Sequence, residues 1–202
     1  MQKPYAESAE QNKDAILEIL RQEFESCYEV LEIGSGTGQH AVYFARHLPH
    51  VRWQTSELEA HLSGIRLWLE EAALDNLPPP VLLDVGTGQW PAGQTDALFS
   101  ANTAHIMSEA NALQMLSGAA DILKSNGRFC LYGPFRYDGQ HTSESNIRFD
   151  AWLKARDPQS GVRDVTRLAA YGASVGLTLV RDHAMPANNR ILVWEKSAEQ
   201  TG

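Results

Sequence analysis

Three glycines at alternate positions, in the stretch EIGSGTG at residues 32–38, form the pattern with the clearest chemical meaning in this chain. Glycine adopts positive φ angles and lets a ligand approach the backbone, and a helix after such a loop offers free N–H groups. A dinucleotide-binding G-x-G-x-x-G loop would place its third glycine at position 39, which is Gln39. The carboxylate of Glu32 would repel an anionic pyrophosphate, whereas it would attract a ligand with positively charged ammonium and sulfonium centres. The alternative is a purely structural turn.

Two further acids end the next two predicted strands. Glu57 lies about twenty residues after the loop and can accept hydrogen bonds from both hydroxyls of a ribose. Asp84 can accept a hydrogen bond from the exocyclic amine of adenine, with the backbone N–H of Val85 reaching the ring. Ligands of open α/β sheets bind at the carboxyl ends of the strands, so we expect both acids beside the loop. Each acid has a simpler interpretation as a cap of the helix or turn that follows.

The stretch ANTAHI at residues 101–106 follows the fourth predicted strand. Its position faces the far end of such a nucleoside ligand, so backbone carbonyls near Asn102 are candidates to hold an ammonium group. His105 is a candidate general base, because histidine titrates near neutral pH. A structural or pocket-shaping histidine fits the sequence equally well.

Strands that alternate with helices must position these residues. Apolar runs predict strands at 28–33, 51–55, 81–85, 96–101, 128–132, 177–181 and 190–195. Helical periodicity predicts helices at 10–24, 39–47, 59–73, 109–123, 149–155 and 165–173, with a polar loop at 133–145. This alternation predicts an α/β fold with a doubly wound, Rossmann-like, seven-stranded sheet that is mostly parallel. The last two strands are too close for a crossover helix and should form an antiparallel C-terminal hairpin at the sheet edge.

Length and composition favour one domain. The chain has 202 residues, of which 43% are hydrophobic and 21% charged. We expect a single domain at 1–202, with an N-terminal helical lid at 1–27 and a core at 28–196. The net charge of −8 disfavours nucleic acid, and no apolar stretch predicts a membrane span. Two distant cysteines, Cys27 and Cys130, and no secretory signal predict a cytoplasmic protein without a metal site.

Together these motifs resemble the class I S-adenosylmethionine-dependent methyltransferases, through EIGSGTG, the acid at 57, LDV at 83–85 and ANTAHI. Over nearly the whole chain the sequence is similar to the DUF938 family, the methyltransferase-like protein 26 group. That similarity lies in AESAEQNKDAIL at 6–17, LYGPF at 131–135, TSESNIRFDAWLKARDPQSGVRD at 142–164 and MPANN at 185–189. The resemblance implies S-adenosylmethionine as cofactor, S-adenosylhomocysteine as product, and methyl transfer to a small polar or aromatic acceptor. One departure is Glu57, where we would expect aspartate.

Two sets of site residues follow from the motifs and the resemblance. The expected cofactor contacts are Asn12, Glu32, Gly34, Ser35, Gly36, Gly38, Glu57, Leu58, Asp84, Val85 and Asn102. The expected acceptor pocket contains Tyr5, Ser8, Tyr132, Phe135, Ser143, Ser145, Asn146, Phe149, Arg163 and Asn188, with Pro134, Trp152, Arg156 and Asn189 as further candidates. Simpler interpretations exist here too, since Phe149 and Trp152 are spaced like the buried side of a helix and Arg163 could pair with Asp164 on the surface.

Competing functions remain open at this point. An NAD-dependent oxidoreductase is opposed by the glycine spacing, by Glu32 and by the lack of a Tyr-x-x-x-Lys pair. A non-catalytic S-adenosylmethionine-binding sensor or partner subunit is compatible with intact cofactor positions, because binding and catalysis use different residues. We expect a small-molecule methyl acceptor as the partner, with no nucleic acid or membrane, in a monomer or homodimer.

Overall fold

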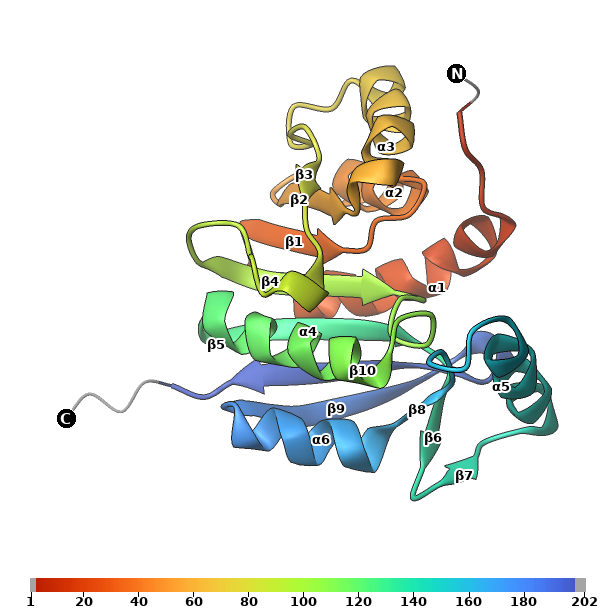
Figure 1. Ribbon diagram of the computed structural model, residues 1–202. Helices are drawn as coiled ribbons and strands as arrows, with labels where there is room; N and C mark the ends of the chain where they lie inside the picture. Colours follow the sequence, from red (N-terminus) through yellow and green to blue (C-terminus); the bar gives the residue numbers. More distant parts are fainter. Residues whose placement is uncertain (1–2, 199–202) are drawn as a thin grey trace.

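The apolar runs pair into one seven-stranded sheet in the computed structural model, which describes residues 3–198 (Figure 1). Its strands are β1 (Glu29–Ile33), β2 (Arg52–Glu57), β3 (Val81–Leu82), β4 (Thr95–Ala101), β5 (Leu123–Gly133), β9 (Leu177–Met185) and β10 (Asn189–Lys196). Their spatial order is β3-β2-β1-β4-β5-β10-β9, and β10 runs antiparallel to both of its neighbours. The mostly parallel sheet with an antiparallel C-terminal hairpin is therefore confirmed. The ends of the expected domain, 1–2 and 199–202, lie outside the described residues.

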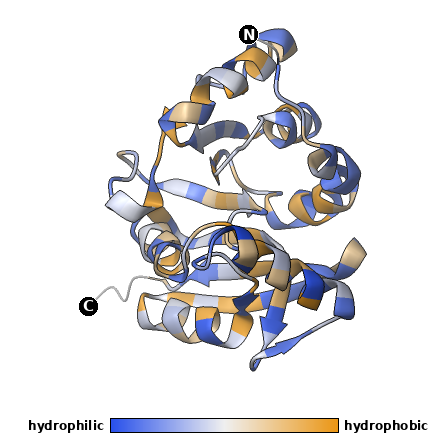
Figure 2. Ribbon diagram, turned by 45° about the vertical axis from the view of Figure 1, so that its right-hand side comes forward, coloured by the Kyte–Doolittle hydropathy of each residue, from blue (hydrophilic) through white to orange (hydrophobic). Residues whose placement is uncertain are grey.

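Helices cover both faces of this sheet. They are α1 (Glu7–Glu23), α2 (Gln39–His47), α3 (Glu59–Ala72), α4 (Glu109–Ile122) and α6 (Val165–Ser174), while α5 (Glu144–Arg156) lies away from both faces. Successive strand residues point to opposite faces, so Val30 and Phe99 pack with α1, α2 and α3, while Leu31 and Leu98 pack with α4 and α6. Figure 2 shows the matching alternation of hydrophobic and hydrophilic stretches along the helices. None of the described helices has the length and apolar character needed to cross a membrane.

A second, small sheet replaces part of the loop that we predicted at 133–145. It consists of β6 (Phe135–Tyr137), β7 (Gln140–His141) and β8 (Arg163–Asp164) in the order β7-β6-β8. The turn between β6 and β7 places Asp138 and Gly139 at positive φ, and the N–H of Gly139 donates to Asp164 Oδ2 over 2.7 Å. The sheet lies with α5 beyond the carboxyl ends of the central strands, on the right in Figure 1.

Several predicted boundaries differ from the structure, and for two of them a side-chain hydrogen bond gives the reason. α5 begins at Glu144 rather than 149, because the Ser143 hydroxyl accepts the N–H of Asn146 and caps the helix. β3 ends at Leu82 rather than 85. After it, Asp84 Oδ1 accepts the N–H of Gly86 over 2.9 Å and starts a 3₁₀ turn, η1 (Val85–Thr87), which takes the chain out of the sheet.

Candidate functional site

The glycine loop, residues 32–38, bends tightly at the carboxyl end of β1. Gly34 and Gly36 have φ angles of +70° and +56°. A Cβ on Gly34 would lie 2.3 Å from Cγ2 of Thr103, so Gly34 is packed against the segment that follows β4. A Cβ on Gly36 would meet no atom within 4 Å. The loop is therefore closed on one side by Thr103 and open at Gly36, where a ligand can approach the backbone.

Two loop side chains turn inward rather than toward this open side. The Ser35 N–H donates to Ser56 O over 2.9 Å, and the Ser56 N–H donates to Ser35 Oγ over 3.2 Å. The Glu32 side chain is buried, and Trp53 Nε1 donates to its Oε2 over 3.1 Å. Burial raises the pKa of Glu32 to about 7, against the opposing hydrogen bonds from Trp53 and Ser35. Both residues support the loop from the core side.

The end of β2 presents a carboxylate beside apolar surface. Glu57 pairs in register with Leu82 of β3. Leu82 is 57% exposed and Leu58, next to Glu57, is 46% exposed. A carboxylate flanked by exposed leucines suits a nucleoside, because the acid can accept ribose hydroxyls while apolar side chains cover a base. Asp84 lies just beyond, where its Oδ1 caps η1 as the simpler interpretation expected, and Val85 is buried.

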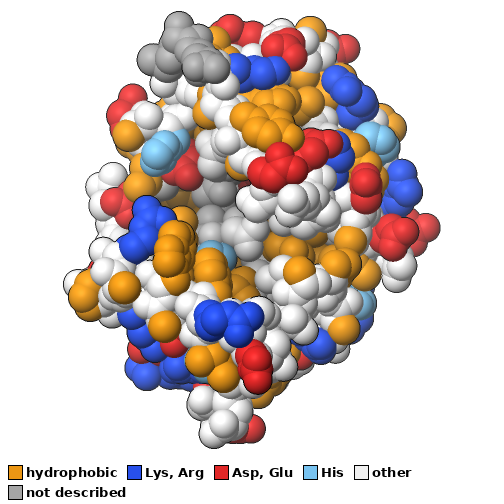
Figure 3. Space-filling model, turned by 90° about the vertical axis from the view of Figure 1, so that its right-hand side faces the viewer, with side chains coloured by type: hydrophobic (Ala, Val, Ile, Leu, Met, Phe, Trp, Pro, Cys, Tyr) orange, Lys and Arg blue, Asp and Glu red, His pale blue; other side chains and the backbone are white. Residues whose placement is uncertain are grey.

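A cavity of about 990 Å³ opens on the face of the molecule where the parallel strands end (Figure 3). Residues of α1, β5, α5, the β9–β10 hairpin and the segments after β4, β5 and α5 line it. They are Ser8, Gln11, Asn12, Ala15, Asn102, His105, Ile106, Tyr132, Pro134, Ser145, Asn146, Phe149, Trp152, Leu153, Arg156, Asp157, Ser160, Pro186, Ala187, Asn188 and Asn189. The volume matches the upper end of small-molecule sites, about 300–1,000 Å³.

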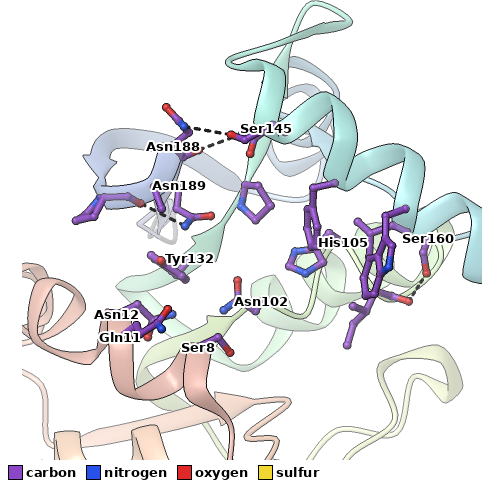
Figure 4. Close-up of a pocket in the computed structure, with 18 of the residues that line it drawn as sticks. Ser8, Gln11, Asn12, Asn102, His105, Tyr132, Ser145, Ser160, Asn188 and Asn189 are labelled. Atoms are coloured by element: carbon purple, nitrogen blue, oxygen red, sulfur yellow. Dashed lines mark hydrogen bonds between the residues drawn. The ribbon is translucent and has the colours of Figure 1, made fainter.

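Carboxamides and hydroxyls form one side of the cavity (Figure 4). Asn12 Oδ1 lies 2.7 Å from His40 Nε2, which holds the amide against α2. Asn146 Nδ2 donates to the carbonyl of Asn188 over 3.1 Å, and Asn188 Nδ2 donates to Ser145 Oγ over 3.3 Å. These bonds tie α5 to the β9–β10 hairpin across one edge of the cavity.

Asn102 and His105 lie between the glycine loop and the aromatic side of the cavity. Asn102 has a φ of +59°, which is uncommon for a residue with a side chain and recurs at ligand sites. His105 is buried and meets Phe149 edge-on, with 5.1 Å between ring centroids. Burial, helped by the charge of Arg163, lowers the pKa of His105 to about 4. The imidazole is therefore neutral at pH 7 and can accept a hydrogen bond from a ligand.

The family model described as "Protein of unknown function (DUF938)" matches residues 3–196. This chain belongs to the DUF938 family. Its fold is that of the class I S-adenosylmethionine-dependent methyltransferases, as three of the solved structures that it resembles show. The S-adenosylmethionine-dependent methyltransferase SibL superposes with a TM-score of 0.79 at 22% identity, over 94% of this chain and 56% of SibL.

The other two structures give a similar result. An O-methyltransferase family protein from Burkholderia thailandensis has a TM-score of 0.75 at 14% identity, over 93% of this chain and 59% of its own. PigF with SAH has a TM-score of 0.76 at 17% identity, over 90% of this chain and 61% of PigF. The DUF938 chain thus spans little more than half the length of these three proteins.

Three residues expected in the acceptor pocket of this DUF938 protein lie elsewhere. Tyr5 is 60% exposed and outside the cavity lining. Phe135 is buried in the core cluster on the α4 and α6 face of the sheet. Ser143 caps α5 and also lies outside the lining. Pro134, next to Phe135, and Ser145, two residues after Ser143, line the cavity instead.

Arg163 has a position that neither interpretation of the sequence predicted. It is buried behind the cavity wall, and it does not pair with Asp164 on the surface. Its Nε donates to Ala104 O and its Nη2 to Gln159 O, each over 2.9 Å, with a further bond to Met107 O. Arg163 thereby joins the segment 103–107, which carries His105, to the segment after α5.

Eight lining residues were not predicted from the sequence, although some of them had a signal. Gln11 and Ala15 continue the helical spacing of Ser8 and Asn12, so the α1 stripe could have been extended to them. Leu153 continues the α5 stripe in the same way. The others lie in loops or a turn without periodicity: Ile106, Asp157, Ser160, Pro186 and Ala187.

Proposed function

We propose that this protein transfers the methyl group of S-adenosylmethionine to a small polar or aromatic acceptor in the cavity. One observation carries the proposal: the glycine loop and the acceptor cavity are adjacent through Thr103. Gly34 of the loop packs on Thr103, and Thr103 follows Asn102, which lines the cavity. A cofactor on the loop would therefore reach the cavity at Asn102.

The residues present fit that cofactor. The space that a Cβ on Gly36 would enter is open, which suits close backbone approach of the methionine part. We assign the ribose hydroxyls to Glu57, the base to Leu58, Asp84 and Val85, and the methionine ammonium to Asn102 and Asn12. Glu32, Ser35 and Gly38 shape the loop beneath. When bound, S-adenosylmethionine supplies a methyl group on a positively charged sulfur and leaves as S-adenosylhomocysteine.

The side chains of the cavity orient the acceptor and exclude water. Orientation of two reactants supplies about 7–11 kcal/mol in favourable cases, so a good nucleophile needs no strong base. His105 is neutral and buried, so its imidazole accepts a hydrogen bond from the hydroxyl or amino group that will be methylated. That hydrogen bond turns the lone pair of the hydroxyl or amino group toward the methyl group. The acceptor loses one proton as it gains the methyl group, and that proton passes to water or buffer through the open mouth.

Calorimetric titration with S-adenosylmethionine, S-adenosylhomocysteine and NADH tests this proposal. We expect micromolar binding of the two sulfur compounds and none of NADH. Binding of NADH alone would overturn the cofactor assignment. Transfer of a labelled methyl group to acceptors that bind in the cavity would then establish catalysis, and tight cofactor binding with no transfer to any of them would favour the non-catalytic sensor or partner subunit.

We also propose that the chain works as one domain in the cytoplasm, as a monomer or homodimer. The helical lid at 1–27 is supported by α1, which contributes Ser8 and Asn12 to the cavity. A reducing compartment is supported by Cys27 and Cys130, which are free, buried thiols whose pKa values burial raises. Light scattering of the purified protein tests the oligomeric state.

A further inference from the structure

The aromatic side of the cavity exposes apolar surface around two stacked rings. Phe149 and Trp152, one turn apart on α5, stack at an interplanar angle of 17° with 5.8 Å between centroids. Trp152 is 51% exposed although it lines a cavity, and Ile106 beside it is 57% exposed. Water against so much apolar surface is displaced favourably by a planar apolar ligand. This wall therefore favours an aromatic ring.

A cation lies against the same wall. The Arg156 guanidinium carbon is 4.6 Å from the centroid of the Trp152 ring, and Arg156 lines the cavity. Within residues 3–198 no carboxylate lies at ion-pair distance from Arg156, in a protein whose net charge is −8. The neighbouring acid, Asp157, accepts hydrogen bonds from the Gln159 N–H over 2.9 Å and from the Ser160 hydroxyl over 3.4 Å. Arg156 is thus free to pair with a ligand anion.

The remainder of the lining is neutral. Apart from Arg156 and Asp157, the polar groups that line the described cavity are carboxamides, hydroxyls and the neutral imidazole of His105. Such groups both donate and accept hydrogen bonds, so they suit an uncharged hydroxyl or amino group. In Figure 4, Asn102 lies to one side of His105, toward α1, and Ser160 lies to the other. Asp157 belongs to the Ser160 side, because the Ser160 hydroxyl donates to Asp157 Oδ2 over 3.4 Å, and Arg156 is the chain neighbour of Asp157.

The geometry points to an aromatic acid as the acceptor class. Its ring packs against the exposed parts of Trp152 and Ile106, its carboxylate or other anionic substituent pairs with Arg156, and its uncharged hydroxyl or amino group lies toward Asn102. This inference rests on the proposed function, because it names the acceptor of the proposed methyl transfer. The binding it describes is nevertheless measurable without any transfer of a methyl group.

A matched acid and amide test the inference by calorimetry. The probes are 4-hydroxycinnamate and 4-hydroxycinnamamide, titrated with and without saturating S-adenosylhomocysteine. We expect the acid to bind about ten-fold more tightly than the amide, which corresponds to one hydrogen-bonded charge pair. Arg156→Gln should remove that preference by weakening the acid alone. Trp152→Leu should weaken both probes, and its half-exposed position makes it compatible with folding.

Arg148→Gln is the matched control on the same helix. Arg148 is 73% exposed, pairs with Glu144 at 3.8 Å and lies outside the lining, so both affinities should stay unchanged. Equal affinity for acid and amide, no binding of the acid at millimolar concentration, or no effect of Arg156→Gln would overturn the inference. Acid binding that depends on Arg156, without any S-adenosylhomocysteine binding, would support the anion site while refuting the proposed methyl transfer. S-adenosylhomocysteine binding without acid binding would refute the anion site while supporting the cofactor of the proposed methyl transfer.

Discussion

Gly34 of the glycine loop and Thr103 after β4 are in such close contact that a Cβ on Gly34 would lie 2.3 Å from the Thr103 methyl carbon. This contact joins the end of β1 to the end of β4 at the centre of the sheet, where α/β folds bind their ligands. It also fixes the distance between the loop and the cavity wall at Asn102. The two neighbouring glycines, Gly34 and Gly36, should therefore respond differently to the same substitution.

Gly36→Ala should weaken S-adenosylmethionine binding at least ten-fold while the protein remains folded. The added methyl group enters space that is open in the protein, so it meets the ligand rather than another residue. The positive φ of +56° adds a strain of about 1–2 kcal/mol. Calorimetry measures the affinity and urea denaturation the stability. Unchanged affinity would refute the placement of the cofactor at Gly36.

Gly34→Ala is the matched comparison at the other glycine. Its methyl group must displace Thr103, so it should lower the free energy of unfolding by more than Gly36→Ala does. Overpacking costs about 1–3 kcal/mol, in addition to the strain of a positive φ. Gly34→Ala combined with Thr103→Ser, which removes the clashing methyl carbon, should recover part of that loss. Equal stabilities of the two glycine variants would contradict the packing argument.

Glu57→Ala should weaken S-adenosylmethionine binding by about 1–3 kcal/mol, because two ribose hydrogen bonds to a carboxylate are lost. Glu70→Ala on α3 is a suitable control, since Glu70 is exposed and lies outside both the glycine loop and the cavity. Calorimetry of both variants against wild type makes the comparison. An unchanged dissociation constant for Glu57→Ala would leave a structural role for Glu57 as the better explanation.

Much of the fold could be predicted because strong local signals mark its elements. α2 (Gln39–His47) was predicted with its observed bounds, since Gly38 precedes it and Pro49 follows it. β3 was predicted too long, because VLLDV is apolar enough for a strand and only the Asp84 bond to the Gly86 N–H ends it. The small β7-β6-β8 sheet left no signal, because its pairs are two residues long and β8 comes from a distant segment.

The site was predictable where it lies on helices. Asn12 of α1 and Phe149 of α5 lie on helices that were predicted. Ser8 and Asn146 lie on the first turns of α1 and α5, which begin before the predicted starts at 10 and 149. Arg163 could not be placed in this way. Its acceptors Ala104 and Met107 lie more than fifty residues earlier, so only the assembled fold shows that its charge is met by carbonyls.

Arg163→Met should lower the free energy of unfolding by about 2–4 kcal/mol, because one buried and two part-buried carbonyls lose their donor. The loop that carries His105 should also become more mobile, with faster amide exchange at Gly161, whose N–H donates to His105 O. Urea denaturation and hydrogen exchange measure the two effects. Arg167→Met is the control, since Arg167 is 63% exposed and pairs with Glu109 at the surface, and it should change stability by less than about 0.5 kcal/mol.

Glu32 should make the stability of the protein depend on pH near neutrality. Burial raises its pKa in the folded state to about 7, against about 4.3 in the unfolded chain. Between these values the folded state holds a proton that the unfolded state has lost. The contribution of Glu32 to the free energy of unfolding is therefore greatest below pH ~4.3. It falls as the pH rises to ~7 and is constant above that.

The comparison of wild type with Glu32→Gln at pH 5 and pH 8 isolates this effect. The glutamine oxygen can still accept from Trp53 Nε1, and its amide does not titrate. Relative to the variant, wild type should lose on the order of 3 kcal/mol of unfolding free energy from pH 5 to pH 8. Urea denaturation at both pH values measures it, with Glu70→Gln as an exposed control. A difference between wild type and Glu32→Gln that stays constant with pH would show that Glu32 titrates as an ordinary carboxyl, and would place its carboxylate in contact with water or a cation rather than in the core.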